Sequence, residues 1–161
     1  MPAGEPDADT TPAGPRWACY LGPLICVVGL GASIYLTVAH YDEHVSLSCP
    51  ATASINCAKV TRSPQSVIAG VPVAVLGLPF FLGMLALYSP WAWRLRSQLP
   101  GYLRLAGVST GMVFVLYLVY VELFKINAIC LWCTSVHVLT FVLFVVTLLA
   151  QASPARGATT G

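Results

Sequence analysis

Two cysteines near the C-terminal end have the spacing of a redox-active pair. Cys130 and Cys133 lie three positions apart in the stretch "AICLWCTSVH". If a helix begins here, both thiols lie on one face of it. The unpaired N–H groups and the positive dipole end of a helix start stabilise a thiolate. Because a thiolate of low pKa is a good leaving group in disulfide exchange, we expect this pair to form a catalytic disulfide.

A second candidate pair precedes it in the chain. Cys49 and Cys57 are separated by seven residues in a stretch rich in Ser and Ala. One interpretation is a static disulfide that closes a loop on the oxidising side of a membrane. The other, which we favour because a flexible loop suits it better, is a mobile pair that carries electrons from a soluble thiol protein. Such a relay needs a terminal acceptor, and an apolar mouth at a membrane surface suits a quinone.

His137 lies one helical turn after Cys133, on the same expected face. A histidine within a membrane span is costly and usually functional. We expect it to bond a quinone oxygen or to stabilise the Cys133 thiolate, and the alternative is a satisfied interior polar residue.

The remaining thiols and titratable groups have plainer interpretations. Cys19 and Cys26 are seven positions apart, on one face of a helix, and are expected to be packing residues. His40 and His44 lie beside acidic residues and are expected to be solvated. Glu122, near the end of a span, is expected to reach the outer interface.

The composition places these residues in a membrane protein. The chain has 161 residues, of which 57% are hydrophobic and 9% are charged, against about 25% charged in soluble domains. A soluble domain of this length does not bury so much apolar surface. The net charge of +2, without a basic run, gives no indication of nucleic-acid binding.

Four apolar segments approach the length of about 20 residues that a spanning helix needs. They are residues 17–39, 73–88, 102–124 and 128–150. The sequence therefore predicts an all-α integral membrane protein with a four-helix transmembrane bundle in residues 17–150. In the first segment, Gly29, Gly31 and Ser33 offer a small-residue face for close helix contact.

The distribution of Lys and Arg predicts the orientation. Four spans leave five of these residues on the side of the termini, and three on the other side: Arg16, Arg94, Arg96, Arg104 and Arg156, against Lys59, Arg62 and Lys125. We expect a multi-pass protein of the plasma or inner membrane. Its disordered N-terminus (1–16) and its tail (151–161) are then cytoplasmic, and the loop 40–72 and the active site face outward.

The outer loop contains a signal for a short helix. Ser63 followed by Pro64 has the residue types of an N-cap and a first helical position. A helix from Pro64 to the break at 70–72 is too short to span. We expect it to lie on the outer membrane surface and to cover the mouth of the bundle.

Together these motifs resemble the bacterial branch of the vitamin K epoxide reductase family. The resemblance rests on Cys49 and Cys57 in the first outer loop, "NCAKVTRS" at 56–63, the glycine of "VAVLGLPFF" (Gly77) and "CLWC" at the last span. It implies a four-helix bundle around a quinone, menaquinone or ubiquinone, with a short outer helix. It also implies that Cys130–Cys133 is the active-site disulfide, that Cys49–Cys57 is the shuttle pair, and that Ser63 supports the cap near the active site.

The resemblance also indicates the quinone contacts, which we expect to be Val73, Leu76, Phe80, Cys133 and His137. Animal members have tyrosine at the position of His137, and asparagine where this chain has Val73. One contact to a quinone carbonyl is thus absent, which argues against vitamin K epoxide as the substrate. Some bacterial relatives carry a fused thioredoxin-like domain. Because this sequence ends at Gly161, we expect the thiol partner to be a separate thioredoxin-like oxidase.

The resulting hypothesis is a membrane enzyme that supports disulfide formation. A reduced partner attacks Cys49, the freed Cys57 attacks Cys130, and Cys133 delivers electrons to the quinone. Two alternatives remain. The four outer thiols bind a soft metal such as Cu(I) or Zn(II), although no further ligand cluster follows along the spans and no metal site is expected. Otherwise they staple a structural four-span protein.

Overall fold

The computed structural model describes residues 15–153 except 43, 46, 51, 53, 96 and 97. Nearly all of the expected N-terminal segment, most of the tail, Arg96 and Arg156 lie outside the described residues. The longer helices are α1 (Arg16–Tyr41), α3 (Val73–Tyr88), α5 (Leu99–Val121) and α6 (Leu131–Ala152). The shorter elements are α2 (Cys57–Thr61), η1 (Pro64–Ser66), β1 (Val67–Ile68), β2 (Val71–Pro72), α4 (Pro90–Arg94) and η2 (Glu122–Ile126), in which η2 is a π-helix that continues α5.

The predicted all-α membrane bundle is confirmed. Among the described residues, α1, α6 and the continuous helix Leu99–Ile126 are long and apolar enough to cross a membrane, and α3 is a shorter apolar helix. The sequence explains why α3 is short. Pro72 holds an extended backbone before its first residue, and Ser89 is kept extended by Pro90 at its other end.

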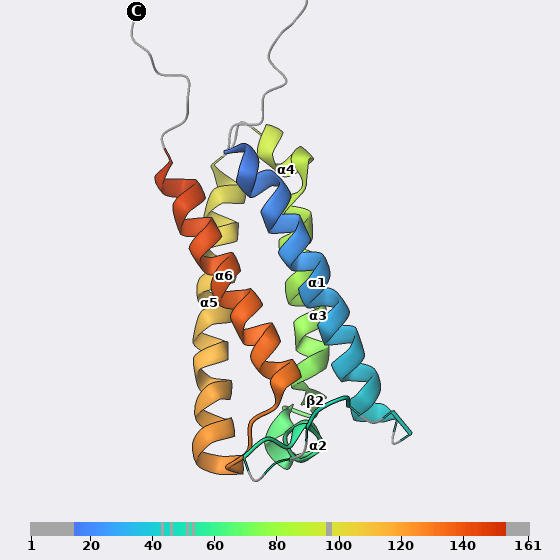
Figure 1. The fold of residues 1–161 in the computed structure, drawn as a ribbon. Coiled ribbons are helices and arrows are strands. Elements are labelled where there is room, and N and C mark those ends of the chain that lie inside the picture. The colour runs from blue at the N-terminus through green and yellow to red at the C-terminus, as the bar shows by residue number, and fades with distance from the viewer. Residues whose placement is uncertain are drawn as a thin grey trace, which may run out of the picture.

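The helices form one elongated bundle, in which α1 packs along α3 and α6, and α6 packs along α5 (Figure 1). At one end, the end of α5 and the start of α6 meet α2 and the β1–β2 hairpin. We call this the cysteine end. At the other end lie α4 and both ends of the described chain. Because both ends of the described chain lie at the same end of the bundle, the chain runs along the bundle an even number of times.

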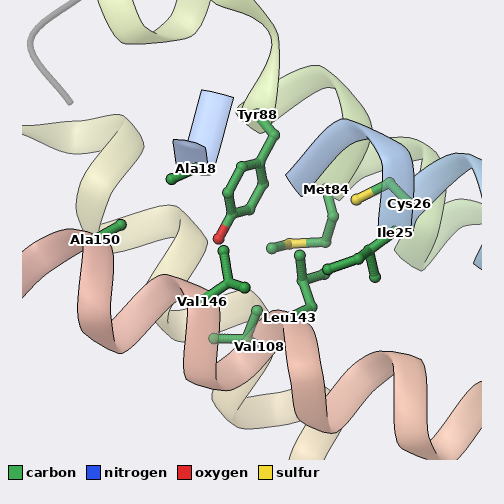
Figure 2. Packing of buried hydrophobic residues seen from close by; sticks show 9 residues of the cluster. All are labelled: Ala18, Ile25, Cys26, Met84, Tyr88, Val108, Leu143, Val146 and Ala150. Atoms are coloured by element: carbon green, nitrogen blue, oxygen red, sulfur yellow. The ribbon is translucent and has the colours of Figure 1, made fainter. Parts of the chain in front are cut away.

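The end opposite the cysteines is well packed (Figure 2). Its buried apolar cluster comprises Ala18, Ile25, Cys26, Met84, Tyr88, Val108, Leu143, Val146 and Ala150. The Tyr88 hydroxyl is 2.5 Å from the Thr147 hydroxyl. Arg104, counted from sequence among the loop charges, is instead buried in α5. Its Nε donates to the Leu87 carbonyl at 2.8 Å, and its guanidinium lies 3.6 Å from the centre of the Trp93 ring.

Cys26 belongs to the buried apolar cluster at this end, so it is a packing residue, as expected.

The small-residue face expected on α1 is correct for two of its three residues. Gly29 packs on the Phe81 ring, and Ser33 lies against Gly77 of α3. Gly31 faces open space. The physical reason is helical periodicity, because residues four apart share a face whereas a residue two positions away points elsewhere.

The expected cap helix is displaced in the chain. A short helix does lie at the cysteine end, but it is α2, which begins after Asn56, and the Asn56 side chain accepts the Lys59 N–H. The helix predicted to start at Pro64 is wrong, because only the single turn η1 forms there and the chain then enters the β1–β2 hairpin. Ser63 makes no side-chain cap bond. Its hydroxyl donates instead to the Val60 carbonyl at 2.8 Å.

Candidate active site

The last helix begins later than predicted, and this places Cys130 at its cap. Asn127 adopts a left-handed backbone, with φ of 51°, that ends η2. Ile129 then pairs with Ile55 in an isolated bridge. The helix therefore starts at Leu131 rather than at 128. Cys130 is the N-cap residue, and its sulfur accepts the Cys133 N–H at 3.3 Å.

This cap position favours a thiolate at Cys130. The pKa of its thiol is lowered to about 7, chiefly because the Cys133 side chain donates a hydrogen bond to its sulfur. Burial acts in the opposite direction, and the Cys133 backbone N–H and the Thr61 hydroxyl add to the lowering. The buried Thr61 hydroxyl makes no hydrogen bond by distance and angle within the described residues, but it lies near this sulfur. The predicted stabilisation of a thiolate at the helix start thus applies to Cys130.

The first pair of cysteines is docked against the second. Cys49 and Cys57 form a disulfide. Cys57, with 2% of its surface exposed, belongs to the same buried cluster as Cys130, which is 0% exposed. The backbone holds the two segments together, because the Asn56 N–H donates to the Ile129 carbonyl and the Ile129 N–H donates to that of Ser54. Cys130 and Cys133 are free thiols.

Trp132, between the two cysteines of α6, fixes the loop beside Cys49. Its indole N–H donates to the Ser48 carbonyl at 3.2 Å, and its ring lies 4.7 Å from that of Tyr35 on α1. The Tyr35 hydroxyl in turn accepts the Ser48 N–H. The sequence interpretation missed this role because nothing in the spacing relates residue 132 to residue 48. The only signal was a large aromatic residue inside the motif.

A cavity of about 760 Å³ lies between the long helices at the cysteine end. All five residues expected to contact a quinone line it, namely Val73, Leu76, Phe80, Cys133 and His137. Cys133 faces this cavity, whereas Cys130 does not line it. Both cysteines pack in or against the cluster that contains Cys57, and they differ because only Cys133 also lines the cavity.

Polar groups line this mostly apolar cavity at several points. His137 and Thr140 of α6 are both buried and lie on its wall. His40, expected to be solvated, also lines it, and its Nδ1–H donates to the Thr61 carbonyl at 2.9 Å. Ser63 does not line the cavity, although the Ser66 hydroxyl, which does, donates to the Ser63 carbonyl. The supporting role of Ser63 stays a prediction.

Glu122 is the residue whose position differs most from expectation. It was expected to reach the outer interface, but it is 7% exposed and lines the cavity. Its carboxyl group lies near the Cys130 main chain and the Cys133 side chain, and it interacts with both. The π-helical turn changes the helical register at the end of α5 and so directs the side chain inward. A carboxylate in an apolar span was itself a signal of function.

The arrangement can carry out sequential thiol–disulfide exchange. A disulfide in a surface loop packs in one buried cluster with a low-pKa cysteine, whose partner in the pair lines a mostly apolar cavity suited to an apolar ligand. Metal binding has less support, since the described part of the chain contains no group of three or more His, Cys, Asp or Glu side chains arranged to hold an ion.

Comparison with known families agrees with this chemistry. The model of a family described as the vitamin K epoxide reductase family matches residues 21–148. The match covers α3 and α5 completely, most of α1 and α6, the Cys49–Cys57 loop and the Cys130–Cys133 motif.

Proposed function

The chain belongs to the vitamin K epoxide reductase family, which makes it a membrane thiol–disulfide oxidoreductase, and from this premise we propose that it passes electrons from a dithiol protein to a quinone. The dithiol protein is of the thioredoxin-like class and lies outside the membrane. The quinone is a substrate that leaves as quinol. The physiological result is the formation of disulfide bonds in exported proteins.

The observation that carries this proposal is the asymmetry of the second pair. Cys130 packs in one buried cluster with Cys57. Cys133 lies on the wall of the apolar cavity. Electrons that enter through the loop therefore meet Cys130 first and reach the cavity through Cys133.

The exchange steps follow from this order. A thiolate of the partner attacks Cys49 and frees Cys57. The Cys57 thiolate attacks Cys130, and the bond between Cys130 and Cys133 breaks. The second thiol of the partner then releases Cys49, which attacks Cys57 and restores the loop disulfide. Cys130 leaves as a thiolate in that last step, and its lowered pKa makes it a good leaving group.

The class of acceptor is argued from the lining of the cavity. Its walls are mainly apolar side chains of α1, α3, α5 and α6, which suits a lipid-soluble ring with an isoprenoid tail. His137 supplies a polar group for a ring oxygen. Menaquinone and ubiquinone both fit this chemistry. We further propose that the cysteine end faces outward and that both termini are cytoplasmic.

Two variants in lipid nanodiscs test the relay. Cys133→Ala is expected to abolish quinone reduction with any thiol donor, because no sulfur remains on the cavity wall. Cys49→Ala is expected to lose turnover with a thioredoxin-like protein donor but to keep reduction by a small dithiol. Quinol formation is followed by its ultraviolet absorbance.

The control is Cys26→Ala, because Cys26 is buried in the packed cluster at the opposite end. It is expected to keep both activities. Full activity of the Cys49 variant with the protein donor contradicts the proposed route through the loop.

A further inference from the structure

Glu122 is a buried acid placed directly beside the reacting sulfurs. Among the described residues it is the one carboxylate that is buried. It lies at the first position of the π-helix η2, and its backbone carbonyl accepts the N–H groups of Asn127 and Ala128. These bonds fix the main chain on which the carboxylate is carried, so its position is set by the fold.

The contacts of Glu122 are unusual for an acid with only a structural role. It is buried and interacts with both the Cys130 main chain and the Cys133 side chain. The same Cys133 thiol also bonds the Cys130 sulfur. The two sulfurs and the carboxyl group are thus neighbours. Glu122 also lines the cavity that Cys133 faces.

We propose that Glu122 is a catalytic residue that gives a proton to the Cys133 sulfur when the Cys130–Cys133 disulfide opens, and takes it back when Cys133 gives up its electrons. This inference rests on the proposed exchange between Cys57 and Cys130. It extends that reaction by naming the group that handles the proton on the departing sulfur.

The step balances as follows. Cys57 forms a bond to the Cys130 sulfur, and the electron pair of the broken disulfide goes to the Cys133 sulfur. Glu122 donates its proton there and becomes a carboxylate. When Cys133 later transfers electrons, its proton returns to Glu122 and the Cys130–Cys133 bond forms again. The two protons of the quinol come from water, and they match the two that the partner dithiol releases.

Other titratable groups near Glu122 must be distinguished from it. From α6, Cys130, Cys133 and His137 face the same region, and His40 of α1 lines the cavity. The cavity-lining residues of α3 are not titratable. On its own turn, Lys125 is exposed. The test therefore compares variants at position 122 rather than a single pH profile.

The decisive comparison is Glu122→Gln against Glu122→Asp. Glutamine keeps the size of the side chain and an acceptor oxygen, but it cannot transfer a proton. Aspartate keeps the acid on a shorter side chain. The measured quantity is the rate at which a small dithiol reduces the Cys130–Cys133 disulfide, from pH 5 to 9. Free thiols are trapped after acid quenching and counted by mass.

Glu122→Gln is expected to slow this exchange by about 100-fold, as the loss of a general acid does, and to remove one ionisation from the rate profile. The exchange rate of Glu122→Asp is expected to lie between that of the wild type and that of Glu122→Gln. Asp42→Asn is the control, because Asp42 is an exposed carboxylate at the end of α1. An exchange rate in the Gln variant close to that of the wild type at every pH overturns the proposal, because the carboxylate then serves only as an acceptor.

The folding of each variant is checked by thermal unfolding. If the Gln variant does not fold, the Asp variant is tested in its place. An ionisation in its rate profile that the wild type also shows supports the proposal, and the absence of that ionisation overturns it. The assay contains no quinone. A wild type that exchanges thiols normally but reduces no quinone therefore refutes the proposed acceptor and leaves the role of Glu122 standing.

Discussion

At the start of α6, two sulfurs three residues apart have distinct roles because the helix begins between them. Cys130 caps the helix and accepts the Cys133 N–H, while Cys133 lies in the first turn and faces the cavity. A cap sulfur is stabilised as a thiolate by the helix end. On the proposed route, Cys130 is the sulfur that accepts and releases the loop, and Cys133 is the one that meets the final acceptor.

The reduced protein is expected to carry a thiolate at Cys130 near neutral pH. Its pKa is lowered from the ordinary value to about 7 by hydrogen bonds, first from the Cys133 side chain. Because the folded-state pKa lies below the unfolded one, this interaction stabilises the reduced protein fully only above the unfolded pKa, and the gain is lost as the pH falls through about 7.

The measurement is the ultraviolet absorbance of the thiolate during titration of the reduced protein. The difference between wild type and Cys130→Ser is expected to rise with a midpoint near pH 7. A midpoint near the ordinary thiol value contradicts the assignment.

The sequence identified the site residues whose types and spacing carry their own meaning. The four outer cysteines and His137 could be selected in this way. Glu122, Trp132 and His40 could not, because their roles depend on contacts between segments that are distant in the chain. The inward direction of Glu122 depends in particular on a π-helical turn, and the residue pattern gave no indication of it.

The helices α1 and α3 pack against each other at small residues. At Gly29 there is no room for a side chain, because the buried Phe81 ring occupies the space, whereas Gly31 of the same helix faces open space. Gly77 likewise allows Ser33 to approach α3. This contact sets the position of the α3 residues on the cavity wall.

Two alanine variants test that contact. Gly29→Ala is expected to destabilise the protein by about 1–3 kcal/mol, because the added methyl group forces Phe81 to move. Gly31→Ala adds the same methyl group where nothing opposes it and is expected to leave stability unchanged or slightly higher. Thermal unfolding in detergent compares the two, and equal losses in both contradict the packing described.

The short elements show why local signals were insufficient at the cysteine end. Ser63 and Pro64 have the residue types of a helix start, yet the chain turns there into a hairpin at Ala69 and Gly70, which both have positive φ. The competing signal was Asn56, which caps α2 and also bonds the segment before α6 through its backbone. A contact with a distant segment decided which of two caps began a helix.

Across the whole molecule, packing and chemistry are divided between the two ends. The opposite end contains a dense apolar cluster, with Tyr88 and Thr147 paired inside it (Figure 2). The cysteine end contains the cavity and the disulfide loop. The four apolar helices of the bundle could be predicted from hydropathy, because a bilayer imposes the length of each span. The cavity did not follow from it, because its shape depends on how side chains of four helices meet.

The central claim is that electrons pass from the loop pair to Cys130–Cys133 and then to a quinone, and a single-turnover yield tests it most directly. The fully reduced protein is mixed with excess quinone under anaerobic conditions, and the quinol formed per protein is counted. Because two cysteine pairs are available, we predict two quinols for wild type, one for Cys49→Ala and none for Cys133→Ala. Quinol formation by Cys133→Ala at the wild-type yield would contradict the account.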